Sequence, residues 1–475
     1  MNSKRLIHLK DGKSESSQKY VIYWMQQSHR VHYNHALNYA IEIANQKNLP
    51  LLVYFGLTPN YPEANQRHYY FMLEGLQEVK TVLEKFHIHF LFKLESPEKG
   101  IKQYLKDAAA LVMDYGYLRL QKLWRKEVLD YALENDYNLS IDIIDTDLIV
   151  PVRVASDKAE YGAYTLRPKI KRLYLEFRDF SKIETIKNQK LLIFESDNDL
   201  TNIQELIDSL DIDKTVSISP IYRGGYIQAS KMFYDFIENK ANRYIDSNDP
   251  SLGLTSKMSM YLHFGQISAL EIMDKMFLLI DQGNLDGASF DAYIEQLLVR
   301  RELAFNFVTY NKGYDQFEKM TEPWAYMTMN EHEFDKRDYL YSLKELENAK
   351  THDPYFNAAM DEMFYTGYMH NYMRMYWAKK IIEWMPTYKE AYDTTLYLNN
   401  KYFIDGRDPN SYTGIAWCFG KHDRAWTERN VFGKLRYMNA KGLERKFNID
   451  GYVKDVETMV KNTINHKKSI VKSKI

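Results

Sequence analysis

The segment from Lys350 to Trp426 holds the densest group of residues that could do chemistry. Aromatic rings, methionines, arginines and aspartates follow one another there more closely than in an ordinary core, and five of the seven tryptophans lie after residue 323. Rings provide flat apolar walls, and fixed charges of both signs can stabilise a ligand whose own charge changes during its work. The composition therefore predicts a site for a buried planar ligand in this part of the chain.

Arg374 and Asp405 are the charged residues of this segment that most need an explanation. Arg374 lies in the middle of a long predicted helix, Glu362 to Trp384, where a guanidinium is costly to bury without a partner. Asp405, in the phrase FIDGRDP, is a natural partner. We expect an ion pair between them, which serves either the ligand or simply the joining of two helices.

Trp377 and Trp384 are seven positions apart on the same predicted helix. Two helical turns place both rings on one face, with about 10 Å of axial rise between them. Indoles at this separation could pass an electron along the helix. Two aromatic residues at this spacing are nevertheless more often ordinary core residues.

A phosphate-binding loop is less obvious. No Walker A sequence is present and no G-x-G-x-x-G pattern opens a helix. The phrase LTSKMSMYLHFGQIS, from Leu254 to Ser268, offers hydroxyl and N–H groups just before a helical pattern, and Ser268 with Glu271 has the spacing of a capping box. The residues alone leave open both a plain helix cap and a phosphate cradle.

Many phrases of the chain resemble the class II cyclobutane pyrimidine dimer (CPD) photolyases. They include HDP, MHNYMRMYWAKKIIEW, LNNKY, DGRDPN, GIAW, HDRAW and GKLRYM, and, earlier, SMYLHFGQIS, VASDKAEYGAYTLRPKI and VIYWMQQSHRVHYNHAL. The resemblance covers nearly everything after about residue 19. It implies a light-driven DNA repair lyase, in which photoexcited reduced FAD donates an electron to a pyrimidine dimer in UV-damaged DNA and then recovers it.

The resemblance also implies which residues bind FAD: Tyr244, Thr255, Ser256, Ser259, Arg374, Asn399 and Asp405. The first four match positions that hold the phosphates and the ribityl chain. The other three match positions around the isoalloxazine ring, where a fixed positive charge favours the anionic reduced form. The amide of Asn399 can donate or accept a hydrogen bond, whichever the ring nitrogen requires.

The implied catalytic residues are Gln296, Arg374, Trp377, Trp384, Asn399 and Asp405, in which the two tryptophans form the route that reduces the flavin. The implied contacts to the dimer and its DNA are Gln296, Arg300, Met375, Trp417, Arg424, Arg429, Lys434 and Arg436. Trp417 and Met375 match the walls of the substrate pocket. The basic residues suit backbone phosphates, although a solvated basic surface explains them equally well.

Three positions depart from the family pattern. Gln296 stands where the family presents a glutamate to the dimer, and Glu295, about 100° away around an α-helix, should face elsewhere. Phe356 replaces the third tryptophan of the electron route, for which Tyr355 could substitute. Met260 replaces a proline, so its turn should be less rigid.

Short apolar runs begin at Val21, Leu49, His87, Ala109 and Leu139, and they alternate with helical patterns. This alternation predicts an α/β domain with a doubly wound, mostly parallel sheet, whose first helix includes RVHYNHAL. Beyond residue 220 nearly every segment has helical period. We expect an antenna-type α/β domain over 19–153, an interdomain linker over 154–220, and a helical FAD- and DNA-binding domain over 221–470, as in the photolyase/cryptochrome fold.

Composition favours a soluble, cytoplasmic monomer. The single cysteine, Cys418, allows no intramolecular disulfide, and no apolar run is long enough to span a membrane. The polar stretch Met1 to Gln18 predicts a frayed start. The net charge is −1, but residues 401–475 hold sixteen basic against eight acidic side chains, which suits DNA even if a solvated tail, Lys467 to Lys474, explains part of it.

Other interpretations remain open. His29, His32 and His35 are close in sequence but do not stay on one helix face, so we expect no metal site. The altered positions leave a cryptochrome-like light sensor and a DNA-binding flavoprotein without repair as alternatives. The resemblance also suggests a second chromophore in the N-terminal domain, a deazaflavin or a folate, and the sequence does not choose between them.

Overall fold

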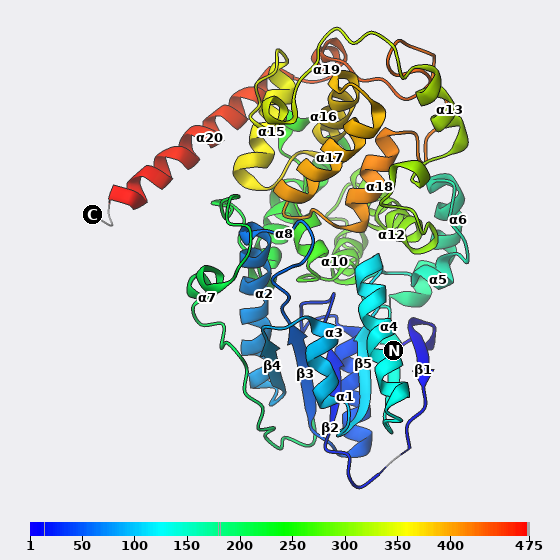
Figure 1. Ribbon diagram of the computed structural model, residues 1–475, viewed down its shortest axis with the longest axis vertical. Coiled ribbons are helices and arrows are strands. Elements are labelled where there is room, and N and C mark those ends of the chain that lie inside the picture. The colour runs from blue at the N-terminus through cyan, green and yellow to red at the C-terminus, as the bar shows by residue number, and fades with distance from the viewer. Residues whose placement is uncertain (14, 179, 181, 473–475) are drawn as a thin grey trace.

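The computed structural model describes residues 1–472 except 14, 179 and 181, with side chains described up to residue 465. A six-stranded sheet and its helices form one end of the molecule, and a larger helical part forms the other (Figure 1). The strand order is β1-β6-β5-β2-β3-β4. The strands are β1 Leu6–Lys10, β2 Tyr20–Trp24, β3 Leu51–Gly56, β4 His89–Lys93, β5 Ala108–Asp114 and β6 Ser140–Ile144.

The sheet is parallel except at one edge, where β1 pairs antiparallel with β6. The prediction of a frayed start is therefore wrong. Arg5, which precedes β1, is buried, and its guanidinium donates to the carbonyl oxygens of Asp145 at 2.9 Å, Leu148 at 2.8 Å and Ile149 at 2.7 Å. These bonds satisfy the buried charge and fix the polar N-terminus against the sheet.

Alternate residues of β2 face opposite sides of the sheet, as the period of two requires. Val21 and Tyr23 pack with α1 His35–Lys47 and α2 Gln66–Lys85, whereas Ile22 and Trp24 pack with α4 Arg119–Glu134. The first helix begins only at His35, because the side chain of Asn34 caps it by accepting from the N–H of Leu37 at 2.9 Å. The phrase RVHYNHAL is thus mostly a loop, and only its last residues are helical.

The predicted linker contains structure of its own. It includes the helices α6 Ala163–Leu173 and α7 Ile203–Ser209, and between them the chain runs back along the sheet (Figure 1). Phe194 packs edge-on against Tyr20 and Tyr104, and the hydroxyl of Ser196 accepts from the N–H of Phe92. The linker therefore covers part of the sheet, and the domain boundaries at 153 and 220 stay predictions.

The described residues of the helical part form two large core clusters, one built chiefly from helices between residues 354 and 418 and the other chiefly from helices between residues 226 and 300. Its helices are α8 Tyr226–Asn239, α9 Ser259–His263, α10 Ala269–Asp281, α11 Gly287–Ile294, α12 Arg301–Tyr310, α13 Pro323–Glu331, α14 Leu343–Glu347, α15 Pro354–Thr366, α16 Asn371–Trp384, α17 Tyr388–Tyr402, α18 Pro409–Cys418, α19 Ala440–Lys446 and α20 Ile449–Lys472. The shorter elements are α3 Pro97–Gly100, α5 Val152–Ala155, the 3₁₀-helices η1 Ser3–Arg5, η2 Ile101–Tyr104, η3 Tyr174–Phe177, η4 Ala241–Asp246, η5 Pro250–Leu252 and η7 Phe317–Lys319, and the π-helix η6 Glu295–Arg300.

The helix predicted from Glu362 to Trp384 is two helices. Gly367 ends α15 with a left-handed φ of +83°, a conformation that costs glycine little. His370 then caps α16 by accepting from the N–H of Tyr372 at 3.2 Å. Arg374 consequently lies near the start of α16 and not in the middle of a long helix.

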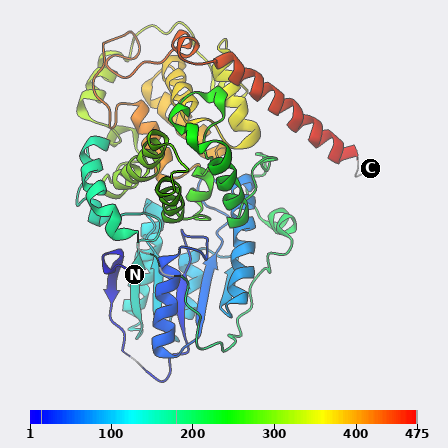
Figure 2. The ribbon, with the colours of Figure 1, turned by 180° about the vertical axis from the view of Figure 1, so that it is seen from behind.

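The C-terminal helix α20 leaves the body of the molecule. Ile449, Tyr452 and Val456 at its start are buried in the first of these core clusters, and its far end projects outward in both views (Figures 1 and 2). The side chains of the predicted basic tail, Lys467 to Lys474, lie outside the described residues. Within the described part of the chain, no helix combines the length and the apolar character needed to cross a membrane.

Candidate functional site

The side chains of Arg374 and Asp405 form a two-pronged ion pair, as the sequence predicts. The distances are 3.0 Å from Nη1 to Oδ1 and 3.1 Å from Nη2 to Oδ2, and Nε donates to the carbonyl oxygen of Met369 at 3.0 Å. The guanidinium carbon also lies 3.9 Å from the centre of the Phe403 ring. Three contacts therefore fix the position and the positive charge of Arg374.

Asn399 lies on α17, and its amide nitrogen donates to the side-chain oxygen of Asn400 at 3.0 Å. The same oxygen of Asn400 accepts from the backbone N–H of Arg407 at 2.9 Å. Asn399 is thereby connected to the turn that carries Asp405. Asn399 and Asp405, two of the three residues predicted to surround the ring, therefore lie on segments that these hydrogen bonds connect.

The predicted phosphate loop reaches the ion pair through Tyr368. The hydroxyl groups of Thr255 and Tyr368 are 2.9 Å apart, and the guanidinium of Arg374 lies 5.9 Å from the centre of the Tyr368 ring. Ser256 accepts a hydrogen bond from Tyr293 at 3.2 Å. The structure thus gathers the loop and the ion pair around one tyrosine.

Ser259 and Tyr244 are the other two residues predicted to hold the phosphates and the ribityl chain. Ser259 begins α9 and is exposed, and Tyr244 lies in η4, packed edge-on against Tyr293 with ring centres 4.9 Å apart. Ser268 caps α10 by accepting from the N–H of Leu270. The capping box is wrong, because Glu271 instead contacts Tyr226 and Lys275.

Lys257 also lies in this loop, although it was not among the predicted site residues. Its φ of +57° is left-handed, and its amine lies 5.6 Å from the centre of the Tyr222 ring and 5.3 Å from that of Tyr368. No carboxylate among the described residues is within ion-pair distance of this amine. Its position in the sequence between two residues with hydroxyl groups, Thr255 and Ser259, is the feature that could have indicated a role in phosphate binding. A lysine without a carboxylate suits a phosphate.

Both predicted electron-route tryptophans are buried on α16. The ring of Trp377 lies 6.3 Å from that of Phe403, which itself contacts Arg374. Its indole N–H has no hydrogen-bond partner among the described residues. Trp384 lies at the far end of α16, and its ring packs against Phe356 at 5.1 Å. Trp377 is therefore the tryptophan nearer the ion pair.

Gln296 and Arg300 lie in the π-helix η6, between α11 and α12. Arg300 donates to the carboxylate of Glu295 at 3.0 Å, which Arg167 binds with two further bonds of 2.9 and 2.7 Å. The carboxylate of Glu295 thus points to two arginines, whereas the side chain of Gln296 is exposed. Burial would raise the pKa of Glu295, but the bonds from Arg167 hold that pKa below its usual value, so Glu295 stays an anion.

Trp417, a predicted wall of the substrate pocket, meets Arg300. The guanidinium carbon of Arg300 is 5.3 Å from the centre of the indole, and His422 packs edge-on against the same ring. Met375 lies on α16 beside Arg374 and is partly exposed. Gln296 is exposed as well. The structure brings Arg300 and Trp417 together, and it leaves Gln296 exposed and Met375 partly exposed.

Two of the four predicted phosphate-binding cations, Arg424 and Arg436, flank the ring of Trp426, which was not among the predicted site residues. Its ring lies 5.0 Å from the guanidinium of Arg424 and 4.4 Å from that of Arg436, and it is 37% exposed. Arg436 also pairs with Asp423 at 2.8 Å. Arg429 lies over Tyr437, and Lys434 is 3.8 Å from Glu428. Only part of this positive charge is therefore free for phosphates.

Similarity to known proteins identifies the family of the chain. Residues 21–189 match the sequence model of the DNA photolyase family. The chain is 45% identical to a deoxyribodipyrimidine photo-lyase of Methanothermobacter thermautotrophicus over 95% of its own length and 98% of that protein. It is 36% identical to the photo-lyase of Arabidopsis thaliana, over 94% of its own length and 91% of that protein. It is 38% identical to the photo-lyase of Potorous tridactylus, over 93% of its own length and 81% of that protein.

The chain belongs to the DNA photolyase family. Solved photolyases share its fold at low sequence identity. A class III photolyase from Agrobacterium tumefaciens superposes with a TM-score of 0.69 at 16% identity, over 93% of this chain and 87% of that one. An archaeal photolyase from Sulfolobus tokodaii, solved with two FAD molecules, superposes with a TM-score of 0.65 at 15% identity, over 92% of this chain and 89% of that one. The predicted fold class, an α/β sheet domain followed by a helical part, is confirmed.

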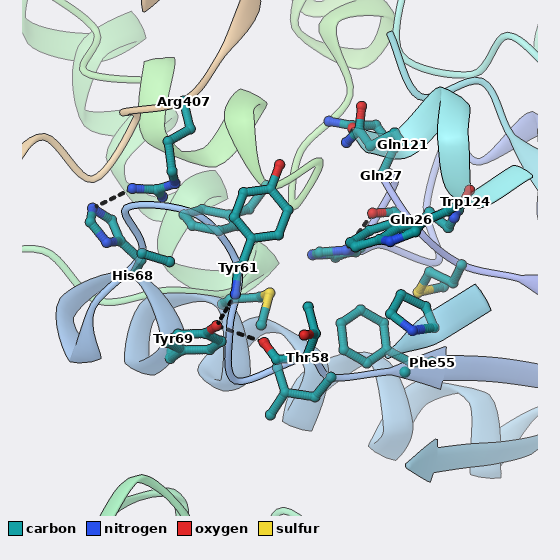
Figure 3. A pocket seen from close by; sticks show the side chains of 18 of the residues that line it. Gln26, Gln27, Phe55, Thr58, Tyr61, His68, Tyr69, Gln121, Trp124 and Arg407 are labelled. Carbon is teal, nitrogen blue, oxygen red and sulfur yellow. Dashed lines mark hydrogen bonds between the residues drawn. The ribbon is translucent and has the colours of Figure 1, made fainter. Parts of the chain in front are cut away.

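This photolyase has a second pocket, which lies at the carboxyl ends of β2 and β3 (Figure 3). Phe55, Trp124 and Tyr61 form flat walls, and Arg407 closes the pocket from the helical part. Gln26, together with the indole N–H of Trp24, has buried polar atoms without partners among the described residues. An apolar pocket with a few unsatisfied polar groups at the carboxyl edge of a parallel sheet suits a planar organic ligand.

Proposed function

We propose that this photolyase is a class II deoxyribodipyrimidine photo-lyase that repairs cyclobutane pyrimidine dimers in DNA, as a monomer in the cytoplasm. The four relatives named deoxyribodipyrimidine photo-lyase, at 35–45% identity, support this activity. The observation that carries the proposal is the connection from the Arg374–Asp405 ion pair through Tyr368 to Thr255. It supplies a fixed positive charge and a hydroxyl-rich loop at one site.

These residues fit FAD. Lys257, Thr255, Ser256, Ser259 and Tyr244 would hold the phosphates and the ribityl chain, because their hydroxyls and the lysine without a carboxylate complement phosphate oxygens. Arg374, Asp405 and Asn399 would surround the ring. Reduced FAD, when bound, supplies the light-driven electron that splits the dimer.

The positive charge of Arg374 has a fixed position before light is absorbed. Its guanidinium cannot reorient, since Asp405, the carbonyl of Met369 and the ring of Phe403 hold it on three sides. A fixed cation lowers the free energy of a neighbouring negative charge without any cost of rearrangement. We assign Arg374 and Asp405 the role of stabilising the reduced, anionic cofactor.

The dimer would enter from the face that carries Trp417 and Arg300. Adjacent linked pyrimidines must leave the base stack to reach a buried site, and a flat indole supports the extruded bases. We assign Gln296 and Met375 to the lining of the same face, and Arg424, Arg429, Lys434 and Arg436 to contacts with backbone phosphates. Trp426, between Arg424 and Arg436, is the exposed ring closest to these cations.

The second pocket would hold an antenna chromophore. Its place at the sheet edge, its flat walls and its unsatisfied polar atoms support a planar ring system such as a deazaflavin, a folate or a flavin. Arg407 is buried in its wall and has no carboxylate within ion-pair distance among the described residues, so it favours a ligand with negative charge.

The decisive experiment is light-dependent loss of thymine dimers from an oligonucleotide, with purified protein whose flavin has been reduced beforehand. We expect repair under blue light and none in darkness. No repair despite bound, reduced FAD would favour the light sensor, for which Gln296 and Phe356 are the supporting observations. Binding that distinguishes damaged from undamaged DNA, but without repair, would instead favour the DNA-binding flavoprotein.

A further inference from the structure

The surroundings of Trp384 contain a phenol–imidazole pair. Tyr341 lies just before α14, and His352 lies just before α15. The ring centres of both are 5.3 Å from the indole of Trp384, and the backbone N–H of Tyr341 donates to the carbonyl oxygen of Trp384 at 3.3 Å. Among the described residues, Tyr341 is the only tyrosine whose ring packs against Trp384.

The hydrogen bonds of this pair have a direction. The phenol oxygen of Tyr341 lies 2.8 Å from Nδ1 of His352, and it accepts from the backbone N–H of the same histidine at 3.0 Å. The phenol has one proton to donate, and we assign it to the bond with Nδ1, in the imidazole tautomer whose Nδ1 accepts. The imidazole proton then lies on Nε2. Tyr339 stacks on the other side of the imidazole, with ring centres 3.8 Å apart, and holds it in place.

This geometry matters because a phenol can lose an electron easily only if it loses its proton at the same time. An imidazole already hydrogen-bonded to the hydroxyl provides an acceptor without any rearrangement. His352 is exposed, so the proton can pass on to solvent. Tyr341 is therefore placed as a proton-coupled electron donor.

Tyr341 is the tyrosine placed to donate to Trp384. The buried amine of Lys380 lies 5.5 Å from the centre of the Trp384 ring, but it pairs with the carboxylate of Glu383 at 2.7 Å, so the pair adds no net charge beside the indole. Tyr355 and Tyr376 also contact carboxylates, of Glu444 and Asp353 respectively, but neither ring packs against Trp384 among the described contacts. The ring contact with Trp384 therefore selects Tyr341.

We propose that Tyr341 is the terminal electron donor of the tryptophan route in this chain and that His352 is its proton acceptor. The proposal rests on the proposed function and on the electron route through Trp377 and Trp384 that the family resemblance implies. One electron passes from Tyr341 to one-electron-oxidised Trp384, while the phenol proton moves to Nδ1 of His352. The products are neutral Trp384, a neutral tyrosyl radical and an imidazolium, so charge and electrons balance.

The test uses the FAD holoenzyme with its flavin oxidised, a blue laser flash and rapid freezing, followed by electron paramagnetic resonance. Ring-deuterated tyrosine identifies the tyrosyl signal. We expect that signal in the wild type, its loss in Tyr341→Phe with a tryptophan radical that lives at least about tenfold longer, and a yield lowered about tenfold in His352→Leu. Tyr339→Phe keeps the stacked ring and is the matched control, in which the signal should persist. Flavin absorbance shows that each variant has folded.

The outcomes separate the two proposals. An unchanged tyrosyl signal in Tyr341→Phe would contradict the role of Tyr341 as electron donor. An unchanged yield of the radical in His352→Leu would contradict the role of His352 as proton acceptor. A wild-type protein with a tryptophan radical and no tyrosyl radical also overturns the pair but leaves the tryptophan route standing. If the wild type forms no tryptophan radical while Trp384→Phe reduces its flavin at the wild-type rate, the route itself is wrong and the pair is overturned with it.

Discussion

The ring of Phe356 packs edge-on against that of Trp384, with centres 5.1 Å apart and planes at 67°. Phenylalanine is much harder to oxidise than tryptophan, so this contact carries no electron. The contact nevertheless shows that a larger ring at position 356 would reach Trp384.

We expect Phe356→Trp to speed light-driven reduction of the flavin at least about tenfold, equivalent to ~1.4 kcal/mol of activation free energy. The measurement is the bleaching of oxidised FAD under blue light with an excess of external thiol. The matched control is Phe356→Leu, which has no ring and should not be faster than the wild type. A Phe356→Trp protein that folds and holds FAD but is no faster would show that the gap at 356 does not limit the route.

Gln296→Glu restores a carboxyl group at the exposed start of the π-helix. We expect a higher repair yield per absorbed photon, because a carboxyl group can donate a proton to the charge that develops on the dimer. The measurement is the quantum yield of dimer splitting with prereduced enzyme. Glu295→Gln serves as the comparison, since Glu295 is bound by Arg167 and Arg300 and should not supply that proton. An unchanged or lower yield in Gln296→Glu would mean that the glutamine is suited to its site.

Lys257→Met removes the amine that lies over Tyr222 and Tyr368. If this lysine holds a phosphate of FAD, the loss of one charge-assisted contact should weaken FAD binding by about 1.5–3 kcal/mol, roughly 10- to 150-fold. The dissociation constant can be measured by flavin fluorescence. Lys231→Met on α8, an exposed position, is the control. Equal affinity in the two variants would remove Lys257 from the cofactor site.

Arg374→Met leaves Asp405 buried without its partner. Breaking a buried pair on one side costs about 3–5 kcal/mol, so the free energy of unfolding without FAD should fall by about this amount. Arg178→Met, which removes a more exposed pair with Asp274, should cost less than about 1 kcal/mol. Urea unfolding measures both. A cost for Arg374→Met no larger than that for Arg178→Met would show that the ion pair does not stabilise the fold.

His422 should make the protein sensitive to acid. Burial lowers its pKa to about 4, against an ordinary value of 6.5, and its Nε2 has no partner among the described residues. Below pH 6.5 the unfolded chain therefore binds a proton that the folded chain refuses, so stability is lost as the pH falls from 6.5 to 4.

We expect His422→Asn to flatten the fall of unfolding free energy between pH 6.5 and pH 4 by close to one proton. Urea unfolding at a series of pH values measures the slope. His87→Asn is the control, because His87 is exposed and its left-handed φ of +56° suits asparagine. Equal slopes in the two variants would contradict the assignment.

The sequence predicts the parts of the molecule that depend on local pattern. Alternating apolar runs locate five of the six strands, and the Arg374–Asp405 pair follows from the cost of burying a charge. β1 escapes because it is a short edge strand within a mostly polar stretch, Met1 to Gln18, and it is held by pairing with β6, by partly buried Leu6, Ile7 and Leu9, and by the buried guanidinium of Arg5. The break at Gly367 and the π-helix at Glu295 depend on backbone angles that a hydrophobic period does not reveal.

The remaining site residues could not be found from local pattern because they meet only in the folded chain. Tyr368 links Thr255 to Arg374 across more than a hundred residues of sequence. The second pocket combines Gln26, Phe55 and Trp124 with Arg407, from four separate segments. The family resemblance named the flavin loop but not Lys257, whose amine has meaning only beside the rings of Tyr222 and Tyr368.

The turn at residues 405–407 touches both ligand sites. Asp405 holds Arg374 on one side, and two residues later Arg407 lines the second pocket on the other. With FAD in the proposed site at Arg374 and an antenna chromophore in the proposed site at Arg407, a ligand that shifts this turn in one site would change the affinity of the other. Thermodynamic linkage would make that effect equal in both directions, so loading of the two proposed chromophores would be a coupled equilibrium.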